Sequence, residues 1–329
     1  MSELTLTSPA KINLYLKVLG KRKDGYHNIE TVMQKINLCD TLVLKEKKRG
    51  IRIFCTNEKV PLDESNLCYQ AADLLIKGFS VKKGVEIFIE KRIPVAAGLG
   101  GGSSNAASVI LGLNKLWNLK INRKGLLKIG GEIGADVPFF ISPFLTAKCQ
   151  GKGDEISPFS FPQDLYYLLV VPDFAVSTKE IYEGLGLVAR STPLISPARK
   201  SRFKYLSATS LSPIQGTGAR PHSLPSAEPY PLGLRNGFLA TQPKPYNDLE
   251  KVVIKKFPLI ADIKQEFERL GIKSVMSGSG PSVFGILKNG EEGRGVIAAE
   301  KKFREFGKTY ICRSAIAAMK RQNCSDPSL

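Results

Sequence analysis

A glycine-rich run in the first half of the sequence has the composition of a phosphate-binding loop. It consists of Pro94, Val95, Ala96, Ala97, Gly98, Leu99, Gly100, Gly101, Gly102, Ser103 and Ser104. Glycines let the backbone turn tightly and come close to a ligand, and a helix that follows the run presents its free N–H groups and positive dipole end to the loop. With Ser103 or Ser104 as the helix cap, the run predicts a cradle for phosphates. A flexible linker is the alternative, but linkers rarely lead directly into a capped amphipathic helix.

This run differs from two familiar nucleotide-binding motifs. The sequence contains no G-x-x-x-x-G-K-[ST], and position 103 is serine where Gly98 and Gly100 would need a third glycine for G-x-G-x-x-G. The sequence therefore supports neither a P-loop enzyme nor a Rossmann dehydrogenase.

Three polar residues could form a charged site. Residues 11–18 form an expected strand that is otherwise apolar. Lys11 and Asn13 are two positions apart in it and therefore lie on the same face. Asp136 stands between small and apolar residues in the segment 134–140, where a partly buried carboxylate needs a partner. Lys11 is the natural candidate and would keep Asp136 ionised. An aspartate that forms a turn at a helix end is the alternative, and this segment alone does not decide between the two.

A second glycine-rich segment, residues 276–282, contains Gly278 and Ser279 between two expected strands. Its free N–H groups predict a second nest of phosphate size. Taken alone, the segment is equally compatible with an ordinary glycine-rich turn.

The elements that must position these residues fall into two groups. In residues 1–160, strands alternate with helices. After residue 160 the expected elements are a strand at 167–171, a helix at 260–270, strands at 274–276 and 283–287, a helix near 293–306 and a strand near 310–313. This β-α-β-β-α-β order is typical of a ferredoxin-like domain. The sequence therefore predicts an α+β protein with an N-terminal domain at 1–160 and a C-terminal domain at 161–329.

Residues 187–245 interrupt the second domain. They hold nine of the 20 prolines and eight serines, with eight basic residues, one acidic residue and little periodicity. A stretch of this length and composition does not fit inside a compact domain as an ordered loop, so it is interpreted as a disordered insertion.

The composition excludes several classes of protein. The chain has 329 residues with a net charge of +18, which suits nucleic acid, an acidic membrane surface or polyphosphate substrates, or merely reflects a basic proteome. The six cysteines contain no C-x-x-C and only two histidines accompany them, which argues against a zinc site and for free thiols in a reducing compartment. No apolar run is long enough for a membrane span, and residues 1–7 show no secretion signal.

Taken together, these segments resemble the GHMP kinase superfamily, whose three motifs correspond to residues 9–14, 94–107 and 277–282. The resemblance covers about residues 1–186 and 246–317. It implies a two-domain fold, with a ribosomal-protein-S5-like α/β domain followed by a ferredoxin-like domain.

Within this superfamily, the sequence is most similar to the 4-diphosphocytidyl-2-C-methyl-D-erythritol kinase family. The deciding residues are Ala10–Leu14, Arg22–His27 and Gly134–Phe140. The resemblance implies an ATP-dependent kinase of the non-mevalonate isoprenoid route that phosphorylates the 2-hydroxyl of its acceptor.

The resemblance also implies a role for each candidate residue. Asp136 would accept the proton of the hydroxyl and Lys11 would orient it, while residues 94–104 would bind the phosphates of ATP. Further implied contacts are Asn66 near adenine, Asn13, Tyr26, His27 and Tyr182 at the cytidine diphosphate end, and Gly278 and Ser279 among the substrate-binding residues. ATP is the implied phosphoryl donor, and Mg²⁺ is expected to arrive with it because no carboxylate cluster typical of a protein metal cage is visible.

Three alternatives remain at this point. Another small-molecule kinase of the superfamily would share the loop and Lys11 but use a different acceptor. A nucleic-acid binder is suggested by the charge, but the basic residues are scattered and no binding motif occurs; a non-catalytic sensor conflicts with the presence of both Lys11 and Asp136. We expect a small-molecule substrate, no membrane partner, a monomer or weak homodimer, and a location in a bacterial-type cytoplasm or, after removal of a transit peptide, a plastid stroma.

Overall fold

The computed structural model describes residues 2–162, 165–186, 244–287 and 300–315. These residues belong to one compact unit, Met1–Pro193 with Lys244–Leu329. A second unit, Leu194–Pro243, lies outside the described residues, and so does the expected disordered insertion as far as residue 243.

The first sheet has seven strands and carries the N-terminal half of the chain. Its strands are β1 (Glu3–Lys21), β2 (His27–Lys47), β3 (Ile51–Cys55), β4 (Gly84–Glu90), β5 (Thr146–Gln150), β6 (Glu155–Pro158) and β8 (Tyr246–Asn247). The order along the main path is β3-β4-β2-β1-β8, with β5 paired to β2 and β6 to β5. Hydrophobic residues alternate along β3 and β4, and Ile53 of β3 and Val85, Ile87 and Ile89 of β4 are buried.

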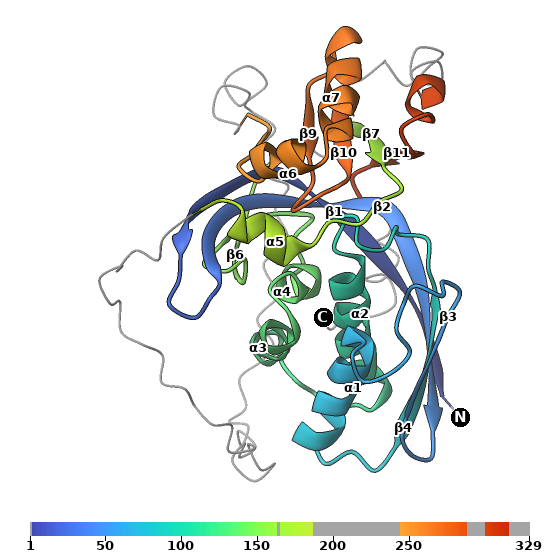
Figure 1. Ribbon diagram of the computed structural model, residues 1–329. Coiled ribbons are helices and arrows are strands. Elements are labelled where there is room, and N and C mark those ends of the chain that lie inside the picture. Colours follow the sequence, from blue (N-terminus) through green and yellow to red (C-terminus); the bar gives the residue numbers. More distant parts are fainter. Residues whose placement is uncertain (1, 163–164, 187–243, 288–299, 316–329) are drawn as a thin grey trace, which may run out of the picture. The chain divides into compact units, whose positions relative to one another are not determined.

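Four helices cover one side of the long strands β1 and β2 (Figure 1). They are α1 (Leu67–Gly78), α2 (Gly101–Leu116), α3 (Arg123–Ile133) and α4 (Val137–Ile141). Leu42 and Leu44 of β2 pack with Ala106 and Ile110 of α2 in the core of this half. Because α2 is buried along most of its length, its first turn has a fixed position relative to the sheet.

Helix α2 starts earlier than the sequence predicted. Its N-cap is Gly100, with φ at 68°, and the helix begins at Gly101. The prediction that Ser103 or Ser104 caps the helix is therefore wrong: a glycine can take the left-handed conformation that ends the loop, so no side-chain cap is required.

The second sheet has the strand order β11-β7-β10-β9. Its strands are β7 (Tyr166–Val171), β9 (Ser274–Met276), β10 (Val283–Leu287) and β11 (Lys308–Arg313), accompanied by α5 (Thr178–Glu183), α6 (Glu250–Lys256) and α7 (Leu259–Arg269). If these four strands are numbered 1 to 4 along the chain, their order in the sheet is 4-1-3-2. This order confirms the ferredoxin-like arrangement. Of the helix expected near 293–306, residues 300–303 are helical and 293–299 lie outside the described residues.

The short strand β8 joins the two halves of the chain. It pairs in parallel with β1, with Tyr246 opposite Tyr15 and Asn247 opposite Leu16. This pairing lies close in sequence to Lys11 and Asn13, so a segment from the second half supports the strand that carries the candidate catalytic lysine. The domain boundary near residue 160 stays a prediction.

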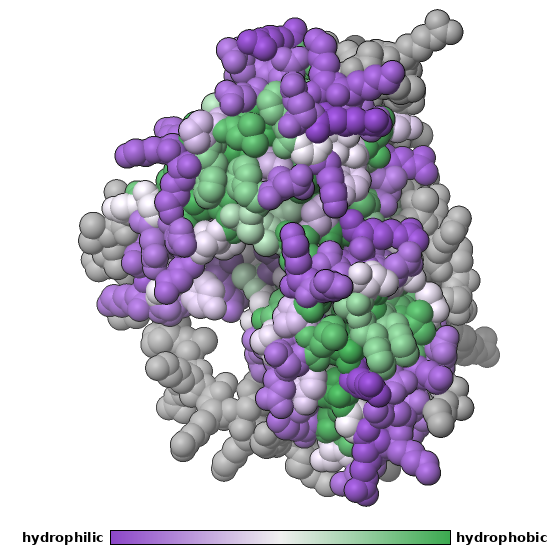
Figure 2. Space-filling model, turned by 45° about the vertical axis from the view of Figure 1, so that its right-hand side comes forward, coloured by the Kyte–Doolittle hydropathy of each residue, from purple (hydrophilic) through white to green (hydrophobic). Residues whose placement is uncertain are grey.

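Both hydrophilic and hydrophobic side chains lie on the surface. In the face drawn in Figure 2, hydrophilic side chains surround separate hydrophobic patches. Within the described part of the chain, no helix has the length and apolar composition needed to cross a membrane.

Candidate active site

A single cavity of about 1150 Å³ brings together almost all of the residues selected from the sequence. Its lining includes Lys11, Asn13, Tyr26, His27, Asn66, residues 94–103, Asp136, Tyr182, Gly278 and Ser279. Ser104 is the exception, because its hydroxyl is buried and accepts a hydrogen bond from Ser8. The structure therefore places four sequence-distant segments around one space.

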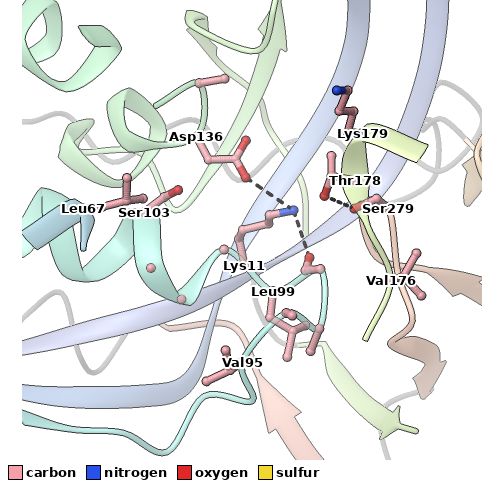
Figure 3. A pocket seen from close by; sticks show the side chains of 18 of the residues that line it. Lys11, Leu67, Val95, Leu99, Ser103, Asp136, Val176, Thr178, Lys179 and Ser279 are labelled. Atoms are coloured by element: carbon pink, nitrogen blue, oxygen red, sulfur yellow. Dashed lines mark hydrogen bonds and ion pairs between the residues drawn. The ribbon is translucent and has the colours of Figure 1, made fainter. Parts of the chain in front are cut away.

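Lys11 and Asp136 face each other across this cavity (Figure 3). Lys11 Nζ lies 3.7 Å from Asp136 Oδ2, and the side chains are 5% and 33% exposed. The expected ion pair is thus present. Asp136 also occupies the N-cap position of α4 but makes no side-chain capping bond, so its carboxylate remains directed at Lys11 and the cavity.

Lys11 is held in place by neighbours on two loops and its own strand. Its Nζ donates to Asn13 Oδ1 at 2.6 Å and to the Gly98 carbonyl at 3.0 Å. Asn13 is fixed in turn, because its Nδ2 donates to Thr31 Oγ1 at 2.8 Å. The prediction that Lys11 and Asn13 share one face of β1 is therefore confirmed, and together they order the ammonium group.

The glycine-rich loop leads into α2 with its first N–H groups free of side-chain caps. These N–H groups have no partner within a helix, so they and the dipole favour a bound anion. Gly98 has φ at 75° and could not carry a side chain without overlap, since a Cβ there would lie 2.3 Å from the Ser277 carbonyl oxygen. The loop therefore lies in direct contact with the second glycine-rich segment.

The second glycine-rich segment is fastened to the first. Ser277 Oγ donates to the Gly98 carbonyl at 3.0 Å, and Ser282 Oγ donates to the Ala97 carbonyl at 2.6 Å. Buried Asn247 donates through Nδ2 to the carbonyls of Met276 (2.8 Å) and Gly278 (2.7 Å). This segment is consequently a wall of the cavity rather than an isolated turn.

Three aromatic residues line the other end of the cavity. The rings of His27 and Tyr182 have centroids 5.0 Å apart at an interplanar angle of 33°. Tyr26 is 56% exposed, and Lys152 Nζ lies 5.6 Å from the centroid of its ring. The rings of His27 and Tyr182 are thus in contact with each other, and the exposed ring of Tyr26 can stack on a flat heteroaromatic group.

Electrostatics differ between these aromatic side chains. Burial, with a smaller effect from Lys21, lowers the pKa of His27 below its ordinary value, which favours the neutral imidazole. Burial and then the Asp136 carboxylate raise the pKa of Tyr182 well above its ordinary value. Both side chains are therefore neutral hydrogen-bonding groups at neutral pH.

A buried lysine supports the helix that starts at Asp136. Lys35 Nζ donates to the carbonyls of Ser142 (2.8 Å) and Phe140 (3.3 Å) at the C-terminal end of α4. Burial, with a smaller effect from Arg123, lowers the pKa of Lys35 to about 7. Sequence reasoning gave no signal for this residue, because it is one of 48 basic residues and its strand position alone does not reveal burial.

Asn66 has a structural task as well as a place in the cavity wall. Its Oδ1 accepts from Cys68 N at 2.8 Å as the N-cap of α1, and its Nδ2 donates to the Pro61 carbonyl at 2.6 Å. Residues that sequence reasoning missed include Thr178, whose Oγ1 lies 2.7 Å from Ser279 Oγ, and Lys179 beside it. A serine-capped start of α5 was the only available signal for them.

Two family descriptions match the chain. Residues 66–143 match the GHMP kinases N terminal domain, and residues 236–304 match the GHMP kinases C terminal domain.

Relatives with curated names cover most of the chain. The chain is 40% identical over 318 residues to the 4-diphosphocytidyl-2-C-methyl-D-erythritol kinase of Clostridioides difficile (strain 630), covering 96% of each protein. It is also 40% identical over 295 residues to the protein of that name in Thermosynechococcus vestitus (strain NIES-2133 / IAM M-273 / BP-1), covering 88% of each.

Solved structures show the same fold. A crystal structure of 4-(cytidine 5'-diphospho)-2C-methyl-D-erythritol kinase matches with a TM-score of 0.67 and 28% identity, over 94% of this chain and 98% of that one. A homoserine kinase from Cytophaga hutchinsonii matches with a TM-score of 0.63 and 17% identity over 95% of each chain, which indicates the fold alone.

Proposed function

Because this chain belongs to the GHMP kinase family, with its two-domain fold, we propose that it transfers the γ-phosphoryl group of ATP to the 2-hydroxyl of 4-diphosphocytidyl-2-C-methyl-D-erythritol. This reaction belongs to the non-mevalonate route to isoprenoid precursors. The observation that carries the proposal is one cavity lined by the Lys11–Asp136 pair, the glycine-rich loop and a group of aromatic side chains.

The pair supplies the chemistry. Asp136 accepts the proton of the attacking hydroxyl, because its carboxylate is one-third exposed and is not used in a capping bond. Lys11 fixes the direction of that carboxylate and offsets the charge that develops on the transferred phosphoryl group. Its bonds to Asn13 and the Gly98 carbonyl hold the ammonium group before substrates bind.

The loop of residues 94–104 holds ATP. Its free N–H groups and the start of α2 bind the β- and γ-phosphates, and the segment containing Gly278 and Ser279 forms the wall next to the loop. Asn66 places the adenine at the start of α1. In this assignment Ser104 serves the core rather than the phosphates, since its hydroxyl bonds to Ser8.

We propose that Mg²⁺ enters with ATP. No group of three or more His, Cys, Asp or Glu side chains in the described residues could hold a metal ion, and the Ser103 hydroxyl in the cavity wall would offer the ion one oxygen ligand. When bound, the ion supplies charge neutralisation at the phosphate oxygens.

The aromatic end of the cavity selects the acceptor. Neutral His27 hydrogen-bonds the edge of the cytosine, and Tyr26 and Tyr182 contact its faces. Asn13, which lines the cavity beside Lys11, is assigned to the cytidine diphosphate end of the acceptor. This arrangement explains why a cytidyl group, rather than a small aliphatic acid, suits the cavity.

A panel of acceptors tests the proposal. ADP release is measured with ATP and, separately, 4-diphosphocytidyl-2-C-methyl-D-erythritol, mevalonate and homoserine, and we expect turnover with the cytidyl acceptor alone. Tyr182→Ala serves as the matched variant, because it should raise the KM of the cytidyl acceptor at least tenfold and leave the KM of ATP within twofold. Turnover with mevalonate or homoserine but not with the cytidyl acceptor would assign the chain to another branch of the family.

The relatives that match are bacterial, and one is cyanobacterial. We propose on that basis a bacterial-type cytoplasm or a plastid stroma as the working compartment. A monomer or weak homodimer stays a prediction from the sequence.

A further inference from the structure

A buried carboxylate outside the cavity wall contacts both ends of the glycine-rich loop. Asp40 lies on β2 and is 0% exposed. It was not selected from the sequence, and the proposed reaction does not use it.

One oxygen of Asp40 holds the chain where it enters the loop. Asp40 Oδ1 accepts from the backbone N–H groups of Arg92 and Ile93, each at 2.8 Å. These are the two residues directly before Pro94, so the starting direction of the loop is fixed to β2.

The other oxygen holds the chain where it leaves the loop. Asp40 Oδ2 accepts from Asn105 Nδ2 at 2.8 Å, and Asn105 lies in the second turn of α2. The same oxygen forms an ion pair with Lys91 Nζ, whose side chain is 4% exposed. Lys91 Nζ also lies 2.8 Å from the position that a Cβ on Gly101 would occupy, so the ion pair is next to the first residue of α2.

Further hydrogen bonds connect this group to the strand of Lys11. Asn105 Nδ2 also donates to Ser8 Oγ at 3.0 Å, and Ser8 Oγ donates to Ser104 Oγ at 2.8 Å. Ser8 and Asp40 are directly opposite each other in the pairing of β1 and β2. The entry of the loop, its exit and the strand of the catalytic lysine therefore share one buried polar network.

We propose that Asp40 is a positioning residue for ATP, which sets the path of residues 94–102 and the direction of the first N–H groups of α2. A phosphate site works only if its donors are held to within about 0.5 Å, and Asp40 fixes both ends of the segment that carries them. The inference rests on the proposed function, because ATP is the ligand assigned to this loop.

Asp40→Asn is the most specific test. The amide oxygen can still accept from Arg92 and Ile93, but the amide nitrogen points a donor at Lys91 and Asn105, so only the exit of the loop is disturbed. We measure the Kd of ATP by titration, without acceptor, together with the KM of ATP and of the cytidyl acceptor. The expected result is a rise of at least tenfold in the Kd and KM of ATP, with the KM of the acceptor within threefold.

Two further variants allow the proposal to be tested even if the Asp40→Asn protein does not fold. Asn105→Ala removes one donor and leaves the backbone contacts of Asp40, and should weaken ATP binding severalfold even if Asp40→Asn does not fold. The double variant Asp40→Asn with Asn105→Asp restores a donor–acceptor pair between positions 40 and 105 and keeps a carboxylate next to Lys91, although the donor to Ser8 is lost, and it should recover part of the ATP affinity. Asp73→Asn, in an ion pair with Lys77 on the surface of α1, is the control and should change nothing.

Two results would overturn the proposal. One is an unchanged Kd of ATP in a folded Asp40→Asn or Asn105→Ala protein. The other is an equal rise in the KM of ATP and of the acceptor, which a general loss of structure would cause. A wild-type protein that binds ATP but phosphorylates none of the acceptors would instead contradict the proposed function and leave the ATP titrations interpretable.

Discussion

Substitution of Gly98 by alanine tests the contact between the two glycine-rich segments. Gly98 has φ at 75°, and its Cβ would lie 2.3 Å from the Ser277 carbonyl oxygen and 2.9 Å from that of Gly280. An ordinary contact begins at 3.4 Å, so the loop and the segment must separate by about 1 Å. That movement would detach the Gly98 carbonyl from Lys11 Nζ and Ser277 Oγ, both at 3.0 Å.

The magnitude follows from two contributions. A left-handed backbone costs a residue with a β-carbon about 1–2 kcal/mol, and each lost hydrogen bond costs about 1 kcal/mol net. If about 2–3 kcal/mol of this appears in ATP binding, the KM of ATP should rise roughly 25- to 140-fold, at about 1.4 kcal/mol per tenfold.

The assay is steady-state ADP release with ATP varied and the cytidyl acceptor saturating. Gly131→Ala is the matched control, because Gly131 lies in α3 outside the cavity wall and its Cβ would meet only Pro138 Cγ at 3.9 Å, so the KM of ATP should stay within twofold. A KM of ATP within twofold of wild type in Gly98→Ala would refute the reasoning, since it would show that the loop tolerates separation from residues 277–280.

Three further results are expected. Lys11→Ala should reduce turnover, and combining it with Asp136→Asn should cost little more than either change alone in the rate of ADP release, because the two groups act as a unit; fully additive losses would mean that they act separately. The lowered pKa of Lys35, about 7 against about 10.5 in the unfolded chain, means that the unfolded state binds more protons between these values. The test is urea titration of wild type and Lys35→Met at pH 7, 8 and 9. The free energy of unfolding of the wild type should increase with pH more steeply than that of the variant, by roughly 1 kcal/mol for each pH unit. If both proteins show the same dependence of this free energy on pH, Lys35 does not titrate in this range. The pKa of His27 is lowered, so its imidazole should become protonated only below the ordinary histidine pKa of about 6.5. This protonation should raise the KM of the cytidyl acceptor and leave the KM of ATP unchanged. If the KM of the acceptor rises in the same way at low pH in His27→Gln, another group is responsible.

The sequence alone was sufficient for features that depend on local periodicity. Alternation along residues 11–18 placed Lys11 and Asn13 on one face, and the strands at 274–276 and 283–287 were located to the residue. The strand order of the second sheet followed from the order of elements, because few arrangements of β-α-β-β-α-β are topologically allowed.

Features that depend on packing between distant segments were not accessible. The cap of α2 was misplaced because a serine hydroxyl and a left-handed glycine can both start a helix, and only the surrounding core decides. The orientation of Ser104 toward Ser8, the bonds of Asn247 to Met276 and Gly278, and the network of Asp40 all join residues at least 29 positions apart. Local patterns gave no signal for these contacts, whereas the Lys11–Asp136 pair could be expected because a partly buried carboxylate needs a partner.

The most direct test of the account is the single-turnover rate of phosphoryl transfer by Asp136→Asn with ATP and the cytidyl acceptor both saturating. The amide keeps the size of the side chain and removes the proton acceptor, so the account predicts a fall of about 10²- to 10⁴-fold with the Kd of ATP nearly unchanged. A rate within threefold of wild type would contradict the assignment of Asp136 as the base and, with it, the central claim that the Lys11–Asp136 pair performs the transfer.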